Sequence, residues 1–435
     1  MATATFIAPA TAPLQHSAGV HKHESLTPSF SAPVRAARTQ LKNCSPSSSP
    51  GVGFAAVAVA AATISARQVR KRRQRQVRGG CPSPSATACR VAAVADAAVD
   101  VEAEVEKDNA GRLRLKYQEK GWKVWNWTDG PAKRFGSIEC HYIVDGPEDG
   151  PPVVLVHGFG ANAYHWRYQV PELAAKGYRV YALDLLGYGW GPRMVLKYTG
   201  EVWAAQISSF LREVVGGPAC LVGNSVGAFV SLLTSALAPD QVTGLVMLNA
   251  AGRWEENQQS GTQRQQLNNV VAEAADKSEP GPILWILEQI QRAIATWSFY
   301  TTKAQIGPIL ESVYENDDMV DEFLIDSIRT PADHPDALDA FGELIQAGRR
   351  TEMSVFQALD ALPQSMPILL LWGQNDPWMR PARADAIRAE CADRGLTCKY
   401  VPLVAGHCPH DDVPEEVNRE LVEWLGERSA QAPSS

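Results

Sequence analysis

Residues 219–227 read ACLVGNSVG, an apolar run that leads directly into a serine placed between two glycines. A helical pattern follows at once. A G-x-S-x-G turn between a buried strand and a helix is strained, so that the serine hydroxyl projects above the sheet. Side chains at the two glycine positions would collide in such a turn. The stretch therefore predicts that Ser225 is a nucleophile, in a turn formed by Gly223, Asn224 and Gly227.

A serine hydroxyl is a weak nucleophile and needs a base beside it. His407, in VAGHCPH, lies just past the last predicted strand and is the predicted base. The acid that orients the imidazole is predicted to be Asp376, in WGQNDPW, on the loop after the penultimate strand. The preceding strand is predicted to end at Asn249, which is not an acid, and this favours Asp376. His410 is a rival base and is interpreted as a surface or supporting residue.

Two backbone N–H groups should stabilise the negative charge that develops on the attacked carbonyl oxygen. One is expected from Val226, directly after the serine. The other is expected from Phe159 in the HGFG loop, where His157 is interpreted as a structural residue.

Apolar runs alternate with helical patterns on both sides of this serine. The predicted strands are 123–127, 138–144, 152–157, 179–184, 219–224, 245–249, 368–372 and 400–403. The predicted helices are 166–175, 198–215, 226–238, 381–394 and 415–425. This alternation predicts a mostly parallel sheet flanked by helices.

A stretch of about 110 residues, 253–363, interrupts the alternation with helical patterns and no convincing strand. It is too long for a loop, so an inserted helical cap is expected. The expected domains are a core of 118–252 and 363–427 and a cap of 253–362. The cap segment 283–300 has one apolar helical face, which favours packing on the core, with an apolar substrate wall near a membrane as the alternative.

Several aromatic residues near these motifs are weaker candidates for substrate contact: Tyr164, Trp166, Trp254, Trp285 and Trp378. For Tyr164 and Trp166, and for the cap helix that holds Trp285, packing is the favoured interpretation.

The charge of the 435-residue chain is divided unevenly. Residues 1–95 hold twelve Lys/Arg and one acid, so the net charge of −7 leaves an acidic body behind a basic leader. An acidic body argues against nucleic acid as a partner. The acid-poor leader is interpreted as a largely disordered targeting segment, with a nuclear or nucleic-acid-binding patch as the alternative for its basic cluster.

The chain on either side of the predicted domains carries weaker patterns. Residues 96–117 are interpreted as a linker, with a lead-in helix as the alternative within 101–120, and 428–435 as a disordered tail. The five cysteines of the body have no CxxC spacing and no metal-ligand spacing, which favours free thiols and predicts no metal site.

With these residues in place, the chain resembles the plastid α/β-hydrolases that remove phytol from chlorophyll pigments, the family of chlorophyll dephytylase and pheophytinase. The matching stretches are WNW (125–127), VLVHGFGANAYHW (154–166), VYALDLLGYG (180–189), VGNSVGAF (222–229), LVMLNAAG (245–252), WGQNDPW (372–378) and AGHCPHDDVPE (405–415). Cap segments 313–323 and 337–341 are also similar. The resemblance covers about residues 120–426, and one departure is Gly191, where such enzymes usually carry Ser.

The resemblance implies an α/β-hydrolase fold and an ester substrate that joins a tetrapyrrole acid to a long isoprenoid alcohol. It also implies a plastid location, either stromal or thylakoid-associated, and a peripheral membrane contact is compatible with such a substrate. The residues themselves imply only serine-dependent acyl-ester hydrolysis, with no metal or organic cofactor. The expected partner is a hydrophobic small-molecule ester, a pigment or a lipid. A general plastid carboxylesterase or lipase is the alternative. An epoxide hydrolase or dehalogenase is disfavoured because those chemistries normally use Asp as the nucleophile, and a non-catalytic binding protein because the Ser, Asp and His set is intact.

Overall fold

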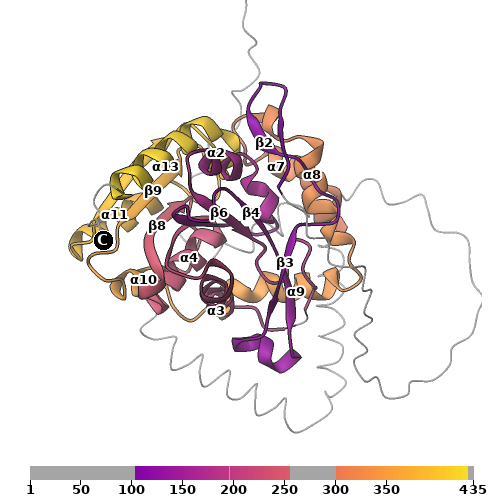
Figure 1. Cartoon of the computed structure of the whole chain (residues 1–435), viewed down its shortest axis with the longest axis horizontal. Coiled ribbons are helices and arrows are strands. Elements are labelled where there is room, and N and C mark those ends of the chain that lie inside the picture. The colour runs from indigo at the N-terminus through magenta and orange to yellow at the C-terminus, as the bar shows by residue number, and fades with distance from the viewer. Residues whose placement is uncertain (1–102, 195, 255–299, 430–435) are drawn as a thin grey trace, which may run out of the picture. The chain divides into compact units, whose positions relative to one another are not determined.

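The computed structural model describes residues 103–194, 196–254 and 300–429, and an eight-stranded sheet lies at the centre of this part (Figure 1). The strand order is β10-β9-β8-β7-β5-β6-β4-β3. Strands β5 to β10 pair in parallel, while β4 pairs antiparallel with both β3 and β6. The strands are β3 (Lys123–Trp127), β4 (Ile138–Asp145), β5 (Pro152–Val156), β6 (Arg179–Leu183), β7 (Ala219–Asn224), β8 (Val242–Leu248), β9 (Ile368–Gly373) and β10 (Cys398–Leu403). The mostly parallel sheet predicted from the sequence is confirmed.

The central strands are apolar throughout because each of them contributes to a hydrophobic core on both faces of the sheet. In β5, Val154 and Val156 face one core, and Val153 and Leu155 face the other. The first core lies under α3 (Gly200–Phe210), α4 (Val226–Leu237), α10 (Val355–Asp360) and α11 (Ala382–Asp393).

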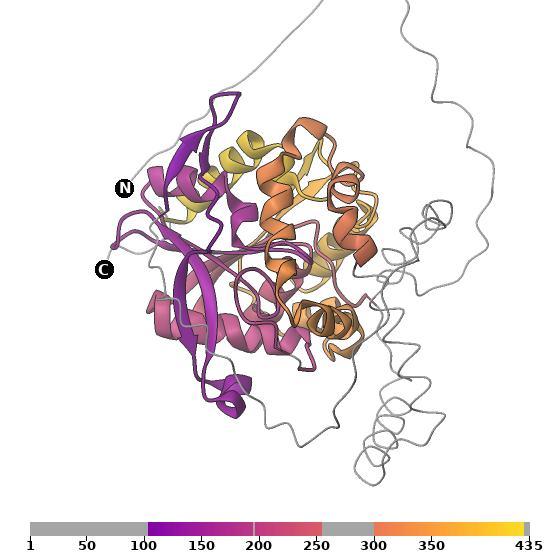
Figure 2. The same cartoon turned by 90° about the vertical axis from the view of Figure 1, so that its right-hand side faces the viewer.

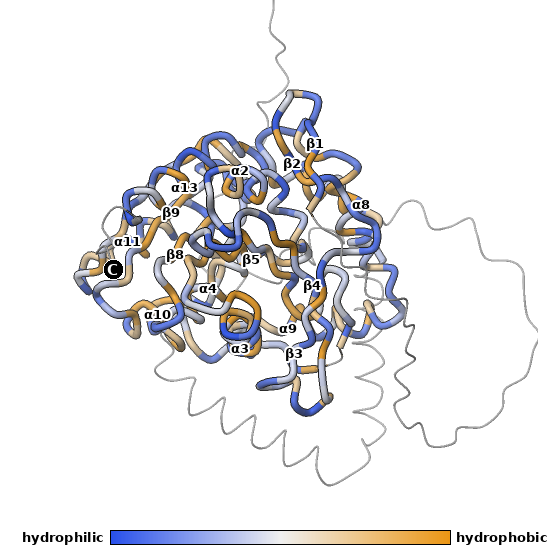
Figure 3. Tube along the Cα trace, viewed as in Figure 1, coloured by the Kyte–Doolittle hydropathy of each residue, from blue (hydrophilic) through white to orange (hydrophobic). Residues whose placement is uncertain are grey.

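The opposite face is covered by α2 (Gln169–Ala175) and α13 (Pro414–Ser429). In Figure 3, hydrophobic and hydrophilic residues alternate along α13, as expected of a helix that packs one face on a sheet. No helix in the described ranges is long and apolar enough to cross a membrane.

The described part of the segment between β8 and β9 is helical, as the sequence predicted. Its helices include α7 (Ile306–Glu311), α8 (Glu322–Arg329) and α9 (Ala337–Arg350). They lie on one side of the sheet in Figure 2, coloured orange. Ile306, Leu310 and Leu324 form a small hydrophobic core of their own with core residues Tyr168 and Cys408. The predicted helix 283–300 lies almost wholly outside the described residues, and Trp285 lies outside them.

The described part of the stretch predicted as a linker or a lead-in helix, residues 103–117, forms neither. Strands β1 (Val105–Lys107) and β2 (Leu113–Leu115) pair as an antiparallel hairpin. Leu115 is fully buried, and its N–H donates to the carbonyl of Arg167 at 2.8 Å. Strands of three residues with charged side chains give almost no periodic signal, which is why the prediction was wrong.

Candidate active site

Ser225 stands in a sharp turn between β7 and α4, with φ 54° and ψ −116°. A positive φ is costly for a residue with a side chain and persists only where the surroundings impose it. Here the Ser225 N–H donates to the carbonyl of Leu248 at 2.9 Å, and the Ser225 carbonyl accepts from the N–H of Ala251 at 3.0 Å. The strand on one side and the loop on the other thus hold the serine in this conformation.

Close backbone contacts account for the two glycines of the motif. A Cβ atom at Gly223 would lie 2.4 Å from the backbone carbonyl of Gly227. A Cβ atom at Gly227 would lie 2.1 Å from the carbonyl oxygen of Val156 in the neighbouring strand. Either side chain would force β7, α4 and β5 apart, so the turn requires glycine at both positions.

The structure brings His407 and Asp376 together. Nδ1 of His407 lies 2.7 Å from Oδ2 of Asp376, and both side chains are buried. Oδ1 of Asp376 accepts the N–H groups of Trp378 at 2.7 Å and Met379 at 2.9 Å. Burial by itself would raise the pKa of Asp376, but the hydrogen bonds and the interaction with His407 outweigh it, so this pKa is lowered overall. Asp376 is thereby kept ionised and aligned with the imidazole.

Asn249 is a member of this site that the sequence analysis passed over. Its Nδ2 donates to Oδ2 of Asp376 at 2.6 Å, and its Oδ1 accepts the N–H of Gly373 at 2.9 Å. The second bond fixes which end of the amide faces the carboxylate. Strand β8 ends at Leu248, one residue before the predicted end, and Asn249 takes a φ of 45°. Its position at the end of a predicted strand was the signal available in the sequence. By itself, that position indicated only that no acid stands there.

The loop after β5 carries Phe159, the second expected source of an oxyanion N–H. The ring of His157 ties this loop down: its Nε2 accepts from Leu185 N–H at 3.0 Å, so Nδ1 holds the proton and donates to the carbonyl of Gly158 at 2.8 Å. Burial lowers the pKa of His157, which favours this neutral form. His157 therefore has the structural position expected from the sequence.

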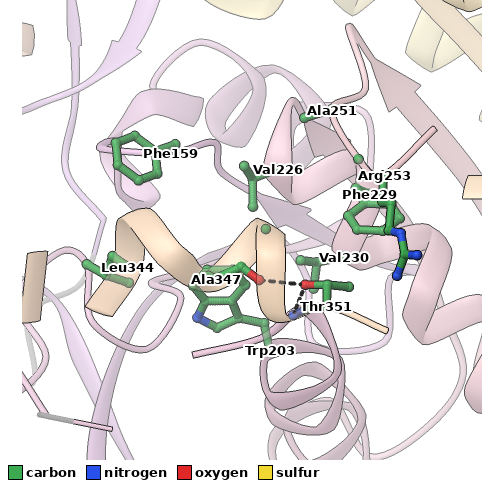
Figure 4. Close-up of a pocket in the computed structure, with 13 residues that line it drawn as sticks. Phe159, Trp203, Val226, Phe229, Val230, Ala251, Arg253, Leu344, Ala347 and Thr351 are labelled. Atoms are coloured by element: carbon green, nitrogen blue, oxygen red, sulfur yellow. Dashed lines mark hydrogen bonds between the residues drawn. The ribbon is translucent and has the colours of Figure 1, made fainter. Parts of the chain in front are cut away.

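Val226 is the first residue of α4, where backbone N–H groups have no acceptor within the helix. Figure 4 shows Phe159 and Val226 on the wall of a pocket of about 400 Å³, with Leu344 and Ala347 of α9 opposite. Both residues also line the larger cavity that contains Ser225. The two expected oxyanion donors thus lie on the same cavity wall as the serine.

Ser225 and His407 line one cavity of about 1300 Å³. Its remaining walls are mainly apolar and come from both the core and the described part of the cap. The apolar side chains contributed by the cap are Ile306, Ile309, Leu310, Val313, Ile328, Phe341 and Ile345. A nucleophile in a long apolar cavity suits a hydrophobic substrate.

The five aromatic candidates divide into three groups. Trp378 lines the Ser225 cavity, and its ring lies edge-on to His407 with a centroid distance of 4.9 Å. Tyr164 and Trp166 are fully buried and are absent from the described lining of that cavity, which agrees with the packing role that the sequence favours for them. They pack in the core, Tyr164 on Trp122 and Trp166 on His410.

Trp254 is also absent from the described lining of the Ser225 cavity. It contacts the ring of Phe356 and the guanidinium of Arg383 instead. Trp285 lies outside the described residues.

The interpretation of His410 as a surface residue was wrong. It is fully buried, with its ring 4.5 Å from that of His165 and 4.2 Å from that of Trp166. Burial lowers the pKa of His410 well below its usual range, so the ring is neutral. His410 is followed in the sequence by Asp411 and Asp412, and such charged neighbours usually indicate an exposed segment, so the sequence did not predict this packing role.

A segment of the cap fixes the backbone of the loop that carries His407. The His407 N–H donates to the carbonyl of Val313 at 2.7 Å. The buried carboxylate of Asp412 accepts three further N–H groups, from Gly406 at 2.7 Å, Asn316 at 2.9 Å and Glu315 at 3.0 Å. Asp412 therefore joins the histidine loop to the cap.

An ion-pair network strengthens the same junction. Arg167 is fully buried and bonds Asp411 at 2.8 Å and cap residue Asp321 at 2.7 Å. Tyr314 of the cap donates to Asp411 at 2.9 Å and lies 2.8 Å from Nε2 of His165. In the described ranges, no group of three or more His, Cys, Asp or Glu side chains is placed to hold a metal ion.

Residues 153–420, more than half of the chain, match the model of the alpha/beta hydrolase family. The chain belongs to the alpha/beta hydrolase family. A solved structure of a thermophilic esterase from Thermogutta terrifontis superposes on 70% of the chain and 99% of its own, with a TM-score of 0.50 and 23% identity, which supports the fold.

Two curated relatives show the range of activities in this family. The chloroplastic pheophytinase of Arabidopsis thaliana is 27% identical over 66% of this chain and 64% of its own length. Epoxide hydrolase B of Mycobacterium tuberculosis is 40% identical over 26% of this chain and 33% of its own. The chain thus spans less than two thirds of the length of these relatives, and their activities are properties of those proteins.

Proposed function

We propose that this hydrolase is a serine-dependent carboxylic ester hydrolase that removes the isoprenoid alcohol from chlorophyll-type pigments in the plastid, in the stroma or at the thylakoid surface. The observation that carries the proposal is the strained Ser225, which shares an apolar cavity of about 1300 Å³ with a His407 bonded to Asp376. This arrangement supplies a nucleophile, a base and an orienting acid for one substrate.

In the proposed reaction, Oγ of Ser225 attacks the ester carbonyl while Nε2 of His407 takes the hydroxyl proton. The N–H groups of Phe159 and Val226 stabilise the tetrahedral oxyanion. Collapse breaks the bond to the alcohol oxygen, which leaves with the proton from His407. Water, deprotonated by His407, then cleaves the acyl-enzyme and releases the carboxylic acid and free Ser225.

The substrate class rests on the cavity and on two resemblances. The side chains that α7 and α9 contribute to the cavity are apolar, as contact with a hydrocarbon chain requires. The sequence motifs are those of the dephytylating plastid hydrolases, and the Arabidopsis relative is a chloroplastic pheophytinase. An aspartate nucleophile, normal for epoxide hydrolases and dehalogenases, is replaced here by serine, which favours ester chemistry.

The test is to incubate the purified protein with chlorophyll a, pheophytin a and p-nitrophenyl butyrate, with Ser225→Ala as the control. We expect phytol and the corresponding pigment acid from at least one pigment, and neither from the variant. Turnover of only the short ester would support a general carboxylesterase and contradict pigment dephytylation.

A further inference from the structure

A second chamber adjoins the Ser225 cavity and differs from it in charge. It has a volume of about 680 Å³ and shares a wall with that cavity that includes Phe159, Ile306 and Phe341. Two cationic side chains, Arg193 and Lys303, line it, and no Asp or Glu does so in the described ranges. Phe159, the expected oxyanion residue, therefore lines both chambers.

Arg193 is buried without a carboxylate partner. Its side chain is 8% exposed, and among the described residues no carboxylate lies within 4.0 Å of its guanidinium. It donates instead to three carbonyl oxygens, those of Gly189 at 2.6 Å, Pro331 at 3.0 Å and Gly191 at 3.3 Å. A guanidinium has five N–H donors, so these bonds leave donors that can face the chamber.

Asp184 attracts the Arg193 guanidinium electrostatically but forms no ion pair with it. The carboxylate of Asp184 accepts the N–H groups of Ala163 at 2.7 Å and Trp190 at 2.9 Å. Burial lowers the pKa of Arg193, and attraction to Asp184 offsets only part of this effect. A guanidinium nevertheless remains protonated in proteins, so a full positive charge is held at the wall of a mostly apolar chamber. Lys303, in contrast, already pairs with Asp333.

We infer that this chamber binds the acyl part of the substrate and that Arg193 recognises an electron-rich oxygen there, a carboxylate or a conjugated carbonyl. The inference rests on the proposed ester hydrolysis at Ser225. Charged and polarised oxygens are strong acceptors for a buried guanidinium. Apart from the oxygen of the ester bond itself, an isoprenoid alcohol offers none and belongs in the apolar cavity under α7 and α9, whereas the tetrapyrrole acid carries carbonyl oxygens besides its propionyl ester. The acyl part of the substrate thus lies in the chamber of Arg193, and the alcohol lies in the apolar cavity.

The test compares two esters that differ only at the far end of the acyl chain, p-nitrophenyl hexanoate and mono-p-nitrophenyl adipate. We expect Arg193→Met to raise KM for the adipate ester about tenfold or more, because a hydrogen bond to a charged group contributes about 1.5–3 kcal/mol. The hexanoate ester should change by no more than about twofold. Lys303→Met, which removes the paired cation of the same chamber, is the matched control and should affect the adipate ester much less.

Arg193→Gln removes the positive charge while it keeps a polar side chain with amide N–H donors. We expect this variant to lose the preference for the adipate ester over the hexanoate ester, as Arg193→Met does. Its thermal midpoint, measured by circular dichroism, should stay close to that of the wild type. Equal losses on both esters would mean that Arg193 only holds the loop and would overturn the inference. So would an adipate preference that survives both substitutions.

A wild-type protein that turns over neither ester leaves the proposed function to the pigment assay described above and the chamber to a binding measurement. Quenching of tryptophan fluorescence by pheophorbide a, a tetrapyrrole carboxylic acid, then decides the question. Binding that weakens about tenfold in Arg193→Gln supports the inference, and equal binding by both proteins overturns it.

Discussion

Asn249 holds the acid of the candidate triad from the side opposite the backbone amides of Trp378 and Met379. Its amide donates to Oδ2 of Asp376, the same oxygen that faces His407. A carboxylate that accepts several hydrogen bonds stays ionised to lower pH. Asn249 is therefore a positioning residue for Asp376. It directly follows β8, at a position where the sequence alone indicated only that the acid of the triad is not there.

Asn249→Ala should reduce kcat about tenfold, since a lost hydrogen bond to a charged group is worth about 1.5–3 kcal/mol. Loss of the donor should raise the pKa of Asp376, so the fall in activity at the most acidic end of the pH–rate profile, where this carboxylate takes up its proton, should begin at higher pH. The profile for p-nitrophenyl butyrate measures both effects. Asn126→Ala, at an exposed position of β3, is the matched control. An acidic limb that does not move would contradict a positioning role.

At the scale of the element, the segment of the cap around Val313 and Asn316 serves as scaffold for His407. Asp412 accepts one N–H from the histidine loop and two from this segment, and only about 1% of the residue is exposed. Buried N–H groups that lose their acceptor cost about 1–3 kcal/mol each. This half of the cap is therefore expected to move together with the core.

Asp412→Ala should lower the free energy of unfolding by about 3 kcal/mol or more and reduce kcat more than it raises KM, because it loosens His407 rather than the cavity walls. Urea denaturation and steady-state kinetics measure the two effects. Asp385→Ala, whose side chain is largely exposed and bonds only Arg388 in the described ranges, should change stability by less than about 0.5 kcal/mol. If the two variants were equally stable, Asp412 would not be the residue that joins the histidine loop to the cap.

Elements with a strong local signal could be predicted from the sequence. Strand β7 was predicted to the residue, because a continuous apolar run ends in a motif with one structural solution. The hairpin of β1 and β2 was missed because its strands are short and depend on contacts with Arg167 and the cap. Asn249 and Asp412 act through partners more than 90 residues away, and single-sequence patterns carry no record of such pairings.

At the scale of the whole molecule, several buried histidines make stability depend on pH. Burial lowers the pKa of His157, of His410, and of His165 to about 3. Their contribution is fully present above the unfolded pKa near 6.5 and is lost as the pH falls below it, because the unfolded chain then binds protons that the folded chain does not. Asp411, whose pKa burial raises, acts in the opposite sense.

The free energy of unfolding should therefore fall by about 3 kcal/mol between pH 6.5 and pH 5.5, since each of the three histidines contributes about 1 kcal/mol over this interval. Urea denaturation over pH 5.5–7.5 measures the change. His410→Gln should reduce the fall by about 1 kcal/mol, while the more exposed His334→Gln should change it little. A free energy of unfolding that does not change over this pH range would contradict the statement that these buried histidines are neutral in the folded protein.

Labelling with a fluorophosphonate probe, followed by peptide mass spectrometry, tests whether Ser225 is an activated nucleophile. We expect one phosphonate on the peptide that contains Ser225. We also expect slower labelling in His407→Gln and no labelling in Ser225→Ala. Labelling that persists in Ser225→Ala, or a folded wild-type protein that takes up no probe, would contradict this role of Ser225.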